Sequence, residues 1–557
     1  METSKPWLKD YPPGIPEGID PGRYHSVNQL FETASRKYRD LPAFTNMGQT
    51  ITYGELDQLC NGFAAFLLSL PGMARGERVA IMLPNLLQYP VAIFGILRAG
   101  LVVVSVNPLY TERELEHQLK DSGARAILVL ENFAAKVEKV MRATELRHVI
   151  VTQIGDMLDM PKRLLANIAV RHVKKMVPSW YIRDAVPFRQ ALSAGQQMRR
   201  SYPEANAADI AFLQYTGGTT GVSKGVMLTH ANVVANVLQC SAWIGKTLRE
   251  REEVVLTPLP LYHVFSLVAN CLTFMPLGGL NVLITNPKDL PAFVKTMQAY
   301  PWTVMTGVNT LYNALANTPG FDRACARKAK LAIGAGAAML RPVMEHWTSL
   351  TGVPMIEGYG LSEATAGVCI NPLGKPRLGS VGIPLPSTDV QIRRDDDSLC
   401  APGEDGEIVV RGPQVMKGYW KRPKETAEVL SADGWLKTGD IGTMDENGWV
   451  TITDRKKDMI IVSGFNVYPA EIEAVVATHP GVLEAAAIGI ADAHSGEAVK
   501  LFVVPRDPRL TAADLLAHCG SNLTRYKIPK QIEFRSELPK TPIGKILRRA
   551  LRETAAR

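Results

Sequence analysis

The chain has 557 residues, too many for a single hydrophobic core, so two or more domains are expected. Hydrophobic residues make up 46% and charged residues 21%, which is the balance of a soluble globular protein and excludes a disordered, collagen-like or coiled-coil chain. Lys and Arg exceed Asp and Glu by 62 to 54, a formal net charge of +8. Such an excess suits nucleic acid, an anionic membrane surface or polyanionic small substrates, and does not choose among them.

Cysteines and apolar stretches indicate the compartment. The seven cysteines are scattered and form no C-x-x-C pair, which argues against a disulfide framework or a zinc site and favours a reducing cytosol. The first residues lack the apolar core of a signal peptide. The stretch 257–287 is uncharged, but prolines and a glycine pair interrupt it and it carries His263 and Asn270. We therefore expect a buried helix followed by a buried strand there, and not a membrane span.

The first predicted elements alternate between strand and helix. Residues 78–83 read as a strand, 85–98 as a helix, and 101–106 and 125–130 as two further strands. Thr111 and Glu114 form a capping box that opens a helix running to about Asp121. This β-α-β-α-β run is typical of a mostly parallel sheet with helices packed on it.

The same alternation returns after Asp209, and then the pattern changes. Strands are expected at 210–215, 254–259, 281–285, 303–306, 331–333 and 354–356, and short strands with Gly and Asp turns at 389–394, 407–411 and 449–454 indicate a small β-rich subdomain. Beyond 458 the order is a helix from 469, strands near 482–490 and 498–504, a helix from 511, a strand near 531–535 and a basic C-terminal helix. We predict an α/β protein with a large N-terminal domain over 1–453, a hinge at 454–458 and a small α+β domain over 459–557.

A loop rich in glycine and threonine follows the strand predicted at 210–215. Backbone amides freed by glycine, hydroxyls and the positive charge of Lys224 suit a phosphate group. It is not a Walker loop, because no Gly-Lys-Ser/Thr tripeptide opens the next helix. A flexible surface loop is the alternative, but the hydroxyls and the lysine favour phosphate binding. The candidate residues are Tyr215, Thr216, Gly217, Gly218, Thr219, Thr220, Gly221 and Lys224.

A second motif runs over 357–365. Tyr359 lies between two glycines, so its ring could pack on a flat base, and Glu363 is a hard oxygen ligand suited to Mg²⁺ that bridges phosphates. Taken alone, a turn with a solvated glutamate is the simpler interpretation. The candidate residues are Glu357, Gly358, Tyr359, Gly360, Ser362 and Glu363.

Three charged residues further along are ambiguous when taken singly. Asp440 could accept hydrogen bonds from both ribose hydroxyls, and Arg455 lies in a similar turn-rich region. Lys545 follows Gly544 near the start of the basic C-terminal helix, where its ammonium group could bridge a carboxylate and a phosphate. Taken singly, turn formers, surface charges and a solvated basic tail are the simpler interpretation of these residues.

The order and spacing of these motifs together resemble the adenylate-forming superfamily, which includes acyl-CoA synthetases, firefly luciferase and the adenylation domains of peptide synthetases. The resemblance covers nearly the whole chain and is nearest to bacterial long-chain fatty-acid–CoA ligases, whose signature is similar to the segment from Asp433 to Asp440 running on to Pro469. Gly218, Ser223 and Ser362 depart from the usual residues, but none of them removes a charge or the Mg²⁺ ligand.

The resemblance implies a role for each motif. The loop 215–225 would bind the ATP phosphates, Thr216 and Glu363 would hold Mg²⁺, Gly334, Gly336 and the 357–360 segment would line the adenine site, and Asp440 and Arg455 would bind the ribose. His263 would lie beside the fatty carboxylate, and Lys545 would promote adenylation. Lys457 would be the hinge of a mobile C-terminal lid, and Ser463, Gly464 and Phe465 would reach the coenzyme A channel. The aromatic gate of some relatives is not evident in the stretch 264–267 and stays unassigned.

The substrate follows from what the apolar stretch lacks. An enzyme that activates amino acids needs an acidic residue to pair with the substrate ammonium, whereas 257–287 has no Asp or Glu and suits an alkyl chain. We predict that the chain converts a long-chain fatty acid, ATP and coenzyme A into fatty acyl-CoA, AMP and pyrophosphate. A ligase for medium-chain or aryl acids, transfer to a carrier protein, or a lipid-binding protein without catalysis are the alternatives. No basic stripe with aromatic residues supports nucleic acid binding.

A basic amphipathic segment over 161–183 bears on localisation. Leu165, Ile168, Ala169, His172, Val173 and Met176 fall on one helical stripe with Lys and Arg beside it. This pattern suits a helix on an anionic membrane surface. It also suits an ordinary helix docked on its own core, which is the commoner use of such a stripe. We expect a cytoplasmic protein that contacts the inner face of the membrane, and the oligomeric state, a homodimer included, stays open.

Overall fold

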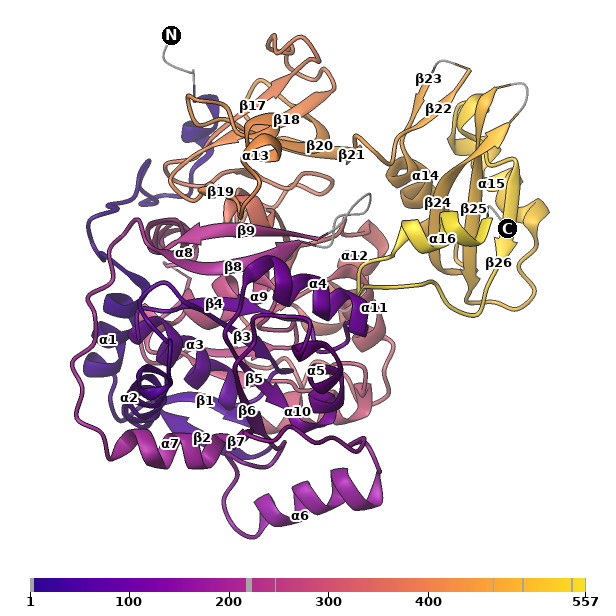
Figure 1. Cartoon of the computed structure of the whole chain (residues 1–557). Helices are drawn as coiled ribbons and strands as arrows, with labels where there is room; N and C mark the ends of the chain where they lie inside the picture. Colours follow the sequence, from indigo (N-terminus) through magenta and orange to yellow (C-terminus); the bar gives the residue numbers. More distant parts are fainter. Residues whose placement is uncertain are drawn as a thin grey trace.

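The structure is a computed structural model. It describes residues 5–216, 223–245, 247–463, 465–492, 495–541 and 544–555. A large body holds most of the chain, and a smaller C-terminal domain stands beside it, joined through the end of strand β21 (Val450–Arg455) (Figure 1). The predicted α/β class is confirmed.

The first predicted β-α-β-α-β run builds one sheet of the body. Strand β3 (Arg78–Met82) lies between β4 (Val102–Ser105) and β5 (Ala126–Leu130), and both pairs are parallel. The full strand order is β19-β9-β8-β4-β3-β5-β6-β7, with β6 (His148–Thr152), β7 (Val186–Pro187), β8 (Ile210–Thr216), β9 (Lys224–Thr229) and β19 (Gly418–Tyr419). Helices α3 (Gln88–Arg98), α4 (Glu112–Ser122), α5 (Ala134–Met141) and α7 (Phe188–Gln196) connect these strands, and α8 (His230–Ile244) leads from β9 to the second sheet.

Two helix starts show how the local sequence acts. Thr111 accepts from the backbone N–H of Glu114, and Glu114 accepts from the N–H of Thr111, so the predicted capping box is present. The helix predicted from residue 85 begins instead at Gln88. Asn85 is buried, and its side-chain amide donates to the carbonyl oxygens of Thr257 and Leu259. Its polar side chain joins two distant segments, which a local helical pattern cannot reveal.

A second sheet of the body has the order β16-β15-β14-β13-β12-β10-β11-β1-β2. Its central strands β10 to β14 are parallel, and their carboxyl ends therefore meet at one edge. The strands are β1 (Pro42–Asn46), β2 (Gln49–Thr52), β10 (Val254–Thr257), β11 (Leu280–Leu283), β12 (Val304–Gly307), β13 (Leu331–Gly334), β14 (Met355–Tyr359), β15 (Cys369–Ile370) and β16 (Ile383–Pro384). The helices near this sheet and at the N-terminus are η1 (Pro6–Asp10), α1 (Val27–Lys37), α2 (Tyr53–Ser69), α10 (Leu290–Ala299), α11 (Asn309–Ala316) and α12 (Arg341–Thr351).

The uncharged stretch 257–287 is buried, as expected. It holds one turn of α-helix, α9 (Val264–Ser266), followed by a π-helical turn, η4 (Leu267–Leu272), a short 3-10 turn, η5 (Met275–Leu277), and then β11. Among the described residues, no helix combines the length and the apolar character needed to cross a membrane.

The β-rich subdomain and the C-terminal domain follow as predicted. The subdomain sheet has the order β17-β18-β20-β21, with β17 (Asp389–Arg393), β18 (Gly406–Arg411) and β20 (Leu436–Met444), and helix α13 (Pro423–Val429) lies near it. In the C-terminal domain the order is β23-β22-β25-β24, and β26 pairs with β25. Its elements are β22 (Ile460–Val462), β23 (Phe465–Val467), α14 (Pro469–Ala477), β24 (Val482–Asp492), β25 (Gly496–Pro505), α15 (Ala512–Asn522), β26 (Gln531–Phe534) and α16 (Arg548–Ala555).

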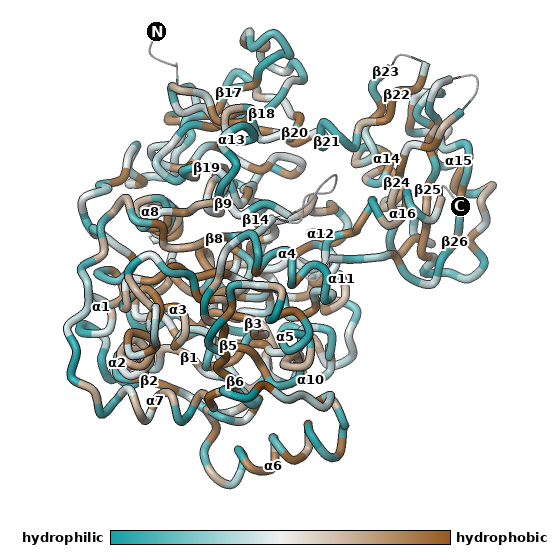
Figure 2. The backbone as a smooth tube through the Cα atoms, viewed as in Figure 1, coloured by the Kyte–Doolittle hydropathy of each residue, from teal (hydrophilic) through white to brown (hydrophobic). Residues whose placement is uncertain are grey.

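The segment 161–183 corrects one expectation. It forms α6 (Lys162–Ile168) and a π-helical turn, η3 (Ala169–Val173), with no buried residue in either, and it projects from the body (Figure 1). The interpretation as a helix docked on its own core is therefore wrong. The side chain of Asn167 accepts from the N–H of Gly155 and donates to Gln153, so a polar residue faces the body. Leu165 and Val173 are 63% and 74% exposed, and hydrophobic residues interrupt the hydrophilic ones along the segment (Figure 2).

Candidate active site

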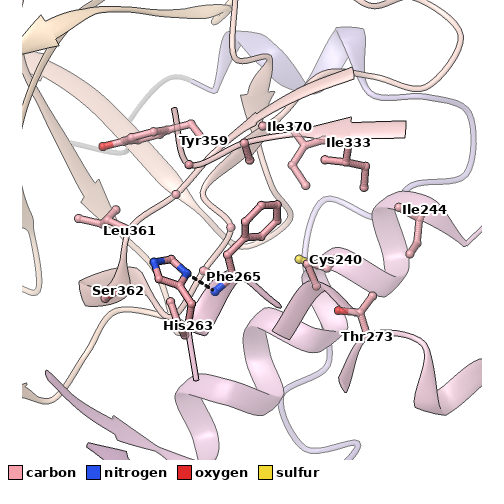
Figure 3. A pocket seen from close by; sticks show the side chains of 18 of the residues that line it. Cys240, Ile244, His263, Phe265, Thr273, Ile333, Tyr359, Leu361, Ser362 and Ile370 are labelled. Carbon is pink, nitrogen blue, oxygen red and sulfur yellow. Dashed lines mark hydrogen bonds between the residues drawn. The ribbon is translucent and has the colours of Figure 1, made fainter. Parts of the chain in front are cut away.

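The candidate site is a cavity at the carboxyl ends of the parallel strands β13 and β14, the edge at which open α/β sheets bind ligands. Its volume is about 740 Å³, counting the space at its open mouth. Figure 3 shows His263, Tyr359, Leu361 and Ser362 on one side and Cys240, Ile244 and Thr273 on the other, with the ring of Phe265 between them. Most of the lining is apolar, as an alkyl chain requires.

Close packing and backbone conformation require glycine at several positions in and beside the cavity. A Cβ atom on Gly334 would lie 2.5 Å from the sulfur of Met339, and one on Gly360 would lie 1.4 Å from the carbonyl oxygen of Ala366. Gly336 has a φ of +79°, a conformation that side chains rarely adopt, and a Cβ there would meet only Val308 within 4 Å. The predicted glycines Gly336, Gly358 and Gly360 line the cavity itself, and Gly334 ends the strand below it.

Asp440, Arg455 and Tyr359 form a polar group at the cavity, in which Asp440 and Tyr359 are buried. Asp440 on β20 and Arg455 on β21 are direct partners in the antiparallel ladder, and Nε of Arg455 lies 2.8 Å from Oδ1 of Asp440. The hydroxyl of Tyr359 donates to Oδ2 of Asp440 at 2.7 Å. Burial, reinforced by the charge of Asp440, raises the pKa of Tyr359 far above its usual range, so the hydroxyl keeps its proton and remains a donor.

Glu357 lies on β14 with its carboxyl group almost completely buried. Burial raises its pKa to about 7, and the N–H of Met339 donates to Oε1 at 3.1 Å. A carboxyl group that titrates near neutrality beside a ligand cavity is common at functional sites. It could accept from an amino group of a base.

Lys545 belongs to the C-terminal domain, on a segment that contacts the body. The N–H of Thr541 donates to the carbonyl of Lys545 at 2.7 Å, and Gly544 takes a φ of +88°. The hydroxyl of Thr310, on α11 of the body, donates to the carbonyl of Gly544 at 2.9 Å. Burial, with the positive charge of Arg455 next, lowers the pKa of Lys545 to about 8.

His263 lies close enough to Lys545 for their charges to interact. Burial, with the charge of Lys545 as the second cause, lowers the pKa of His263 to about 4. The ring is therefore neutral at pH 7, and its Nδ1 accepts the N–H of Phe265 at 3.3 Å. A neutral imidazole thus lines the apolar cavity, with an ammonium group near it, and together they could bind a carboxylate.

The predicted magnesium ligands have chemistry that fits the ion. Glu363 offers a carboxylate whose Oε1 accepts the hydroxyl of Tyr419 at 2.9 Å. The ammonium of Lys224 lies 5.0 Å from the centre of the Tyr419 ring. Mg²⁺ usually binds one carboxylate together with phosphate oxygens and water, and a hydroxyl such as that of Thr216 can join these ligands.

Other predicted residues are placed differently. The side chain of Tyr215 donates to Asp121 at 2.7 Å, away from the cavity lining. Gly217, Gly218, Thr219, Thr220 and Gly221 lie outside the described residues, as does Gly464. Ser463 and Phe465 belong to the β22–β23 hairpin, which stands at the outer end of the C-terminal domain and not at the cavity (Figure 1). Lys457 lies between β21 and β22, and burial lowers its pKa.

Sequence reasoning missed three residues of the site. Tyr419 and Thr310 are far in sequence from the groups they contact, and nothing in their local pattern distinguishes them. Phe265 was visible two residues after His263, in the stretch where the gate stayed unassigned. Its position across the middle of the cavity (Figure 3) is what singles it out.

Comparison with known proteins gives the family. A family model described as AMP-binding enzyme matches residues 31–420, and one described as AMP-binding enzyme C-terminal domain matches residues 471–545. The chain belongs to the AMP-binding enzyme family. Within this family it is 54% identical over 552 residues to a long-chain-fatty-acid–CoA ligase of Salmonella typhimurium, covering 99% of this chain and 98% of that protein. Identity to the ligase of the same name from Bacillus subtilis is 38% over 557 residues, with the same coverage. A feruloyl-CoA synthase of Amycolatopsis is 34% identical over 512 residues, covering 91% and 94%.

Solved AMP-binding enzymes share the fold. ATP-bound MatB from Rhodopseudomonas palustris superposes with a TM-score of 0.79 at 28% identity, over 95% of this chain and 99% of that one. The o-succinylbenzoate CoA synthetase of Bacillus subtilis, in complex with its acyl-adenylate intermediate, gives 0.77 at 26% identity over 94% and 97%.

Proposed function

We propose that the protein activates a long-chain fatty acid with ATP and transfers the acyl group to coenzyme A. The observation that carries this proposal is a mostly apolar cavity lined by His263 and Tyr359. Lys545 lies close enough to His263 for their charges to interact, and Asp440 bonds to both Tyr359 and Arg455. Relatives named long-chain-fatty-acid–CoA ligase at 50 to 54% identity over the full length support the same activity.

Adenylation joins two anions, and the site lowers their repulsion. A carboxylate oxygen attacks the α-phosphorus of ATP, the bond from that phosphorus to the bridging oxygen breaks, and pyrophosphate leaves with the electron pair. Lys545 bridges the carboxylate and the α-phosphate and stabilises charge on the phosphoryl oxygens. His263 binds the carboxylate as a neutral donor, and Asp440 accepts from the ribose hydroxyls with its position fixed by Tyr359 and Arg455.

Magnesium bound to Glu363 and Thr216 would neutralise charge on the phosphate oxygens of ATP. Glu357, together with Gly334, Gly336, Gly358, Gly360 and Ser362, would line the adenine end of the site, and the 215–225 loop would bind the phosphates. Tyr419 supports this arrangement because its hydroxyl orients Glu363.

Thioester formation needs a second arrangement of the domains. The thiol sulfur of coenzyme A attacks the acyl carbon, the bond from that carbon to the phosphate oxygen breaks, AMP leaves, and the thiol proton passes to solvent. In this orientation Lys545 lies close enough to His263 for their charges to interact. The β22–β23 hairpin, to which Ser463 and Phe465 belong, stands away from the body (Figure 1). We infer that the 459–557 domain rotates about Lys457, within the 454–458 segment, relative to the 1–453 domain, and so brings the β22–β23 hairpin to the thiol.

The test is fatty-acid-dependent release of pyrophosphate across acids of graded chain length, with the thioester then detected in the presence of coenzyme A. We expect release with long-chain acids and a thioester only when coenzyme A is present. No release with any fatty acid, or preference for an aryl acid, would contradict the proposal.

Contact with a membrane surface rests on the exposed helix. We propose that the apolar face formed by Leu164, Leu165, Ile168 and Val173 enters the boundary of an anionic bilayer, the source of the fatty acid. The polar face of α6 is already used, since Asn167 is bonded to the body, and Lys162, Lys174 and Lys175 are exposed beside the apolar face. Apolar insertion combined with basic flanks is the pattern of interfacial helices.

Vesicle flotation tests this contact. Leu165→Glu combined with Val173→Glu removes two exposed apolar side chains, each contributing about 1.5–3 kcal/mol when buried, so binding to anionic vesicles should fall about 100-fold or more. The control is Leu399→Glu on the β-rich subdomain, where the side chain is 58% exposed. Equal binding of all three proteins, or binding only to neutral vesicles, would refute the membrane contact.

A further inference from the structure

Few polar contacts join the two domains in this orientation. Apart from the turn 455–459 itself, the described residues provide two such points: the hydroxyl of Thr310 on the carbonyl of Gly544, and the carboxylate of Asp454 on the N–H of Ala470 and the guanidinium of Arg548. One point lies next to Lys545 and the other next to the hinge, where the C-terminal domain meets the body.

Asp454 belongs to the body but binds the C-terminal domain. It lies on β21, where Asp454 pairs with Ile441 of β20, and it is 4% exposed. Oδ2 accepts the N–H of Ala470, in the first turn of α14, at 2.8 Å. Oδ1 lies 3.5 Å from the guanidinium of Arg548. One carboxylate therefore joins the last strand before the hinge to two helices beyond it.

Helix α14 depends on this carboxylate for its N-terminal cap. Tyr468 stands at the N-cap position and gives no side-chain hydrogen bond, and Pro469 follows with no N–H to donate. The first N–H groups of a helix need acceptors, and a negative charge there is favourable. Asp454 provides both from the other domain.

Arg548 carries the contact from Asp454 to the catalytic lysine. It opens α16, three residues after Lys545, and its guanidinium also binds Glu473 on α14 at 2.7 Å and Asp458 at 3.4 Å. Arg552 adds a bond to Asp458 at 2.9 Å. These partners lie beyond the Lys457 hinge and would move with the domain, whereas Asp454 would stay with the body.

We propose that Asp454 and Thr310 form a two-point latch that holds the C-terminal domain in the orientation that presents Lys545. The latch rests on the proposed two-step function, and both residues act as positioning residues through Arg548 and Gly544. Rotation about Lys457 breaks the contacts of Asp454 and Thr310 and leaves the Arg548–Glu473 and Arg552–Asp458 pairs intact. The latch therefore favours adenylation over thioester formation.

The test separates the two half-reactions. Adenylation is followed as long-chain-acid-dependent exchange of pyrophosphate into ATP, and thioester formation as transfer from supplied acyl-AMP to coenzyme A. Asp454→Asn should reduce exchange about tenfold, the size expected for losing one charge-assisted hydrogen bond, and should leave the transfer step unchanged or faster. Thr310→Val should act in the same direction through the other point of contact, and because that side chain is only partly buried the substitution should leave the fold intact.

Glu473→Gln is the matched control, because Glu473 binds the same guanidinium from within the C-terminal domain. It should lower the thermal midpoint without changing the ratio of the two half-reactions. Equal loss of both steps in Asp454→Asn, or an unchanged ratio in Thr310→Val, would overturn the latch. A wild-type protein without exchange activity would instead overturn the proposed function, so the two failures are distinguishable.

Discussion

Ala269 offers the sharpest test of the acyl cavity. It follows Phe265 by one helical turn on the segment that begins at His263, and it lines the cavity. Ala269→Phe places a ring across the path of the chain beyond Phe265. If that ring displaces about four methylene groups, the loss is about 3 kcal/mol at ~0.8 kcal/mol per methylene, or roughly 200-fold in kcat/KM.

The assay compares palmitate with octanoate, whose shorter chain needs less of the cavity. The ratio of kcat/KM for palmitate to that for octanoate should fall roughly 200-fold in Ala269→Phe. Ala299→Phe adds the same ring at the exposed end of α10 and should leave the ratio unchanged. An unaltered ratio in Ala269→Phe, in a protein that still folds, would refute the assignment of this cavity to the alkyl chain.

Three further predictions concern titration and the nucleotide site. Burial lowers the pKa of Lys545 to about 8, so kcat/KM for ATP should fall as pH rises through about 8, and Lys545→Arg should remove that fall; an identical profile in both proteins would exclude Lys545 as its cause. Burial also lowers the pKa of His230 to about 4, so the free energy of unfolding should drop by about 3 kcal/mol as pH decreases from 6.5 to 4. Urea titrations of His230→Gln should show a smaller drop in the free energy of unfolding. An equal drop in the variant and the wild-type protein would contradict the reasoning. Asp440→Asn should reduce kcat/KM for ATP about 100-fold through lost ribose hydrogen bonds, with little effect on octanoate KM, and equal effects on both substrates would point to misfolding instead.

Much of the architecture is encoded locally. The apolar runs predict the ends of the central parallel strands to within one to three residues, and the Thr111–Glu114 capping box lies where the pattern predicts it. Errors came from long-range contacts. Asn85 looks helical, but it bonds to the segment after β10, and α6 looks like a core helix, but its polar side is bonded to the body through Asn167.

The site shows the same division. Glycines and charged residues in the motifs could be proposed from the sequence because binding of phosphate, Mg²⁺ and ribose would require those residue types. Their pairing could not: the register that places Asp440 opposite Arg455, and the hydrogen bond from Tyr359 to Asp440, depend on strands brought together from different parts of the chain. Tyr419 and Thr310 have no local signal because their role is set entirely by what they contact.

The most direct test of the account is a crystal structure with a non-hydrolysable analogue of a palmitoyl adenylate. We predict that the ribose hydroxyls bond to Asp440, that the adenine packs against Tyr359, that the phosphate mimic faces Lys545, and that the alkyl chain passes Phe265 into the cavity. An analogue bound elsewhere, or with its alkyl chain outside the cavity between α8 and β14, would contradict it.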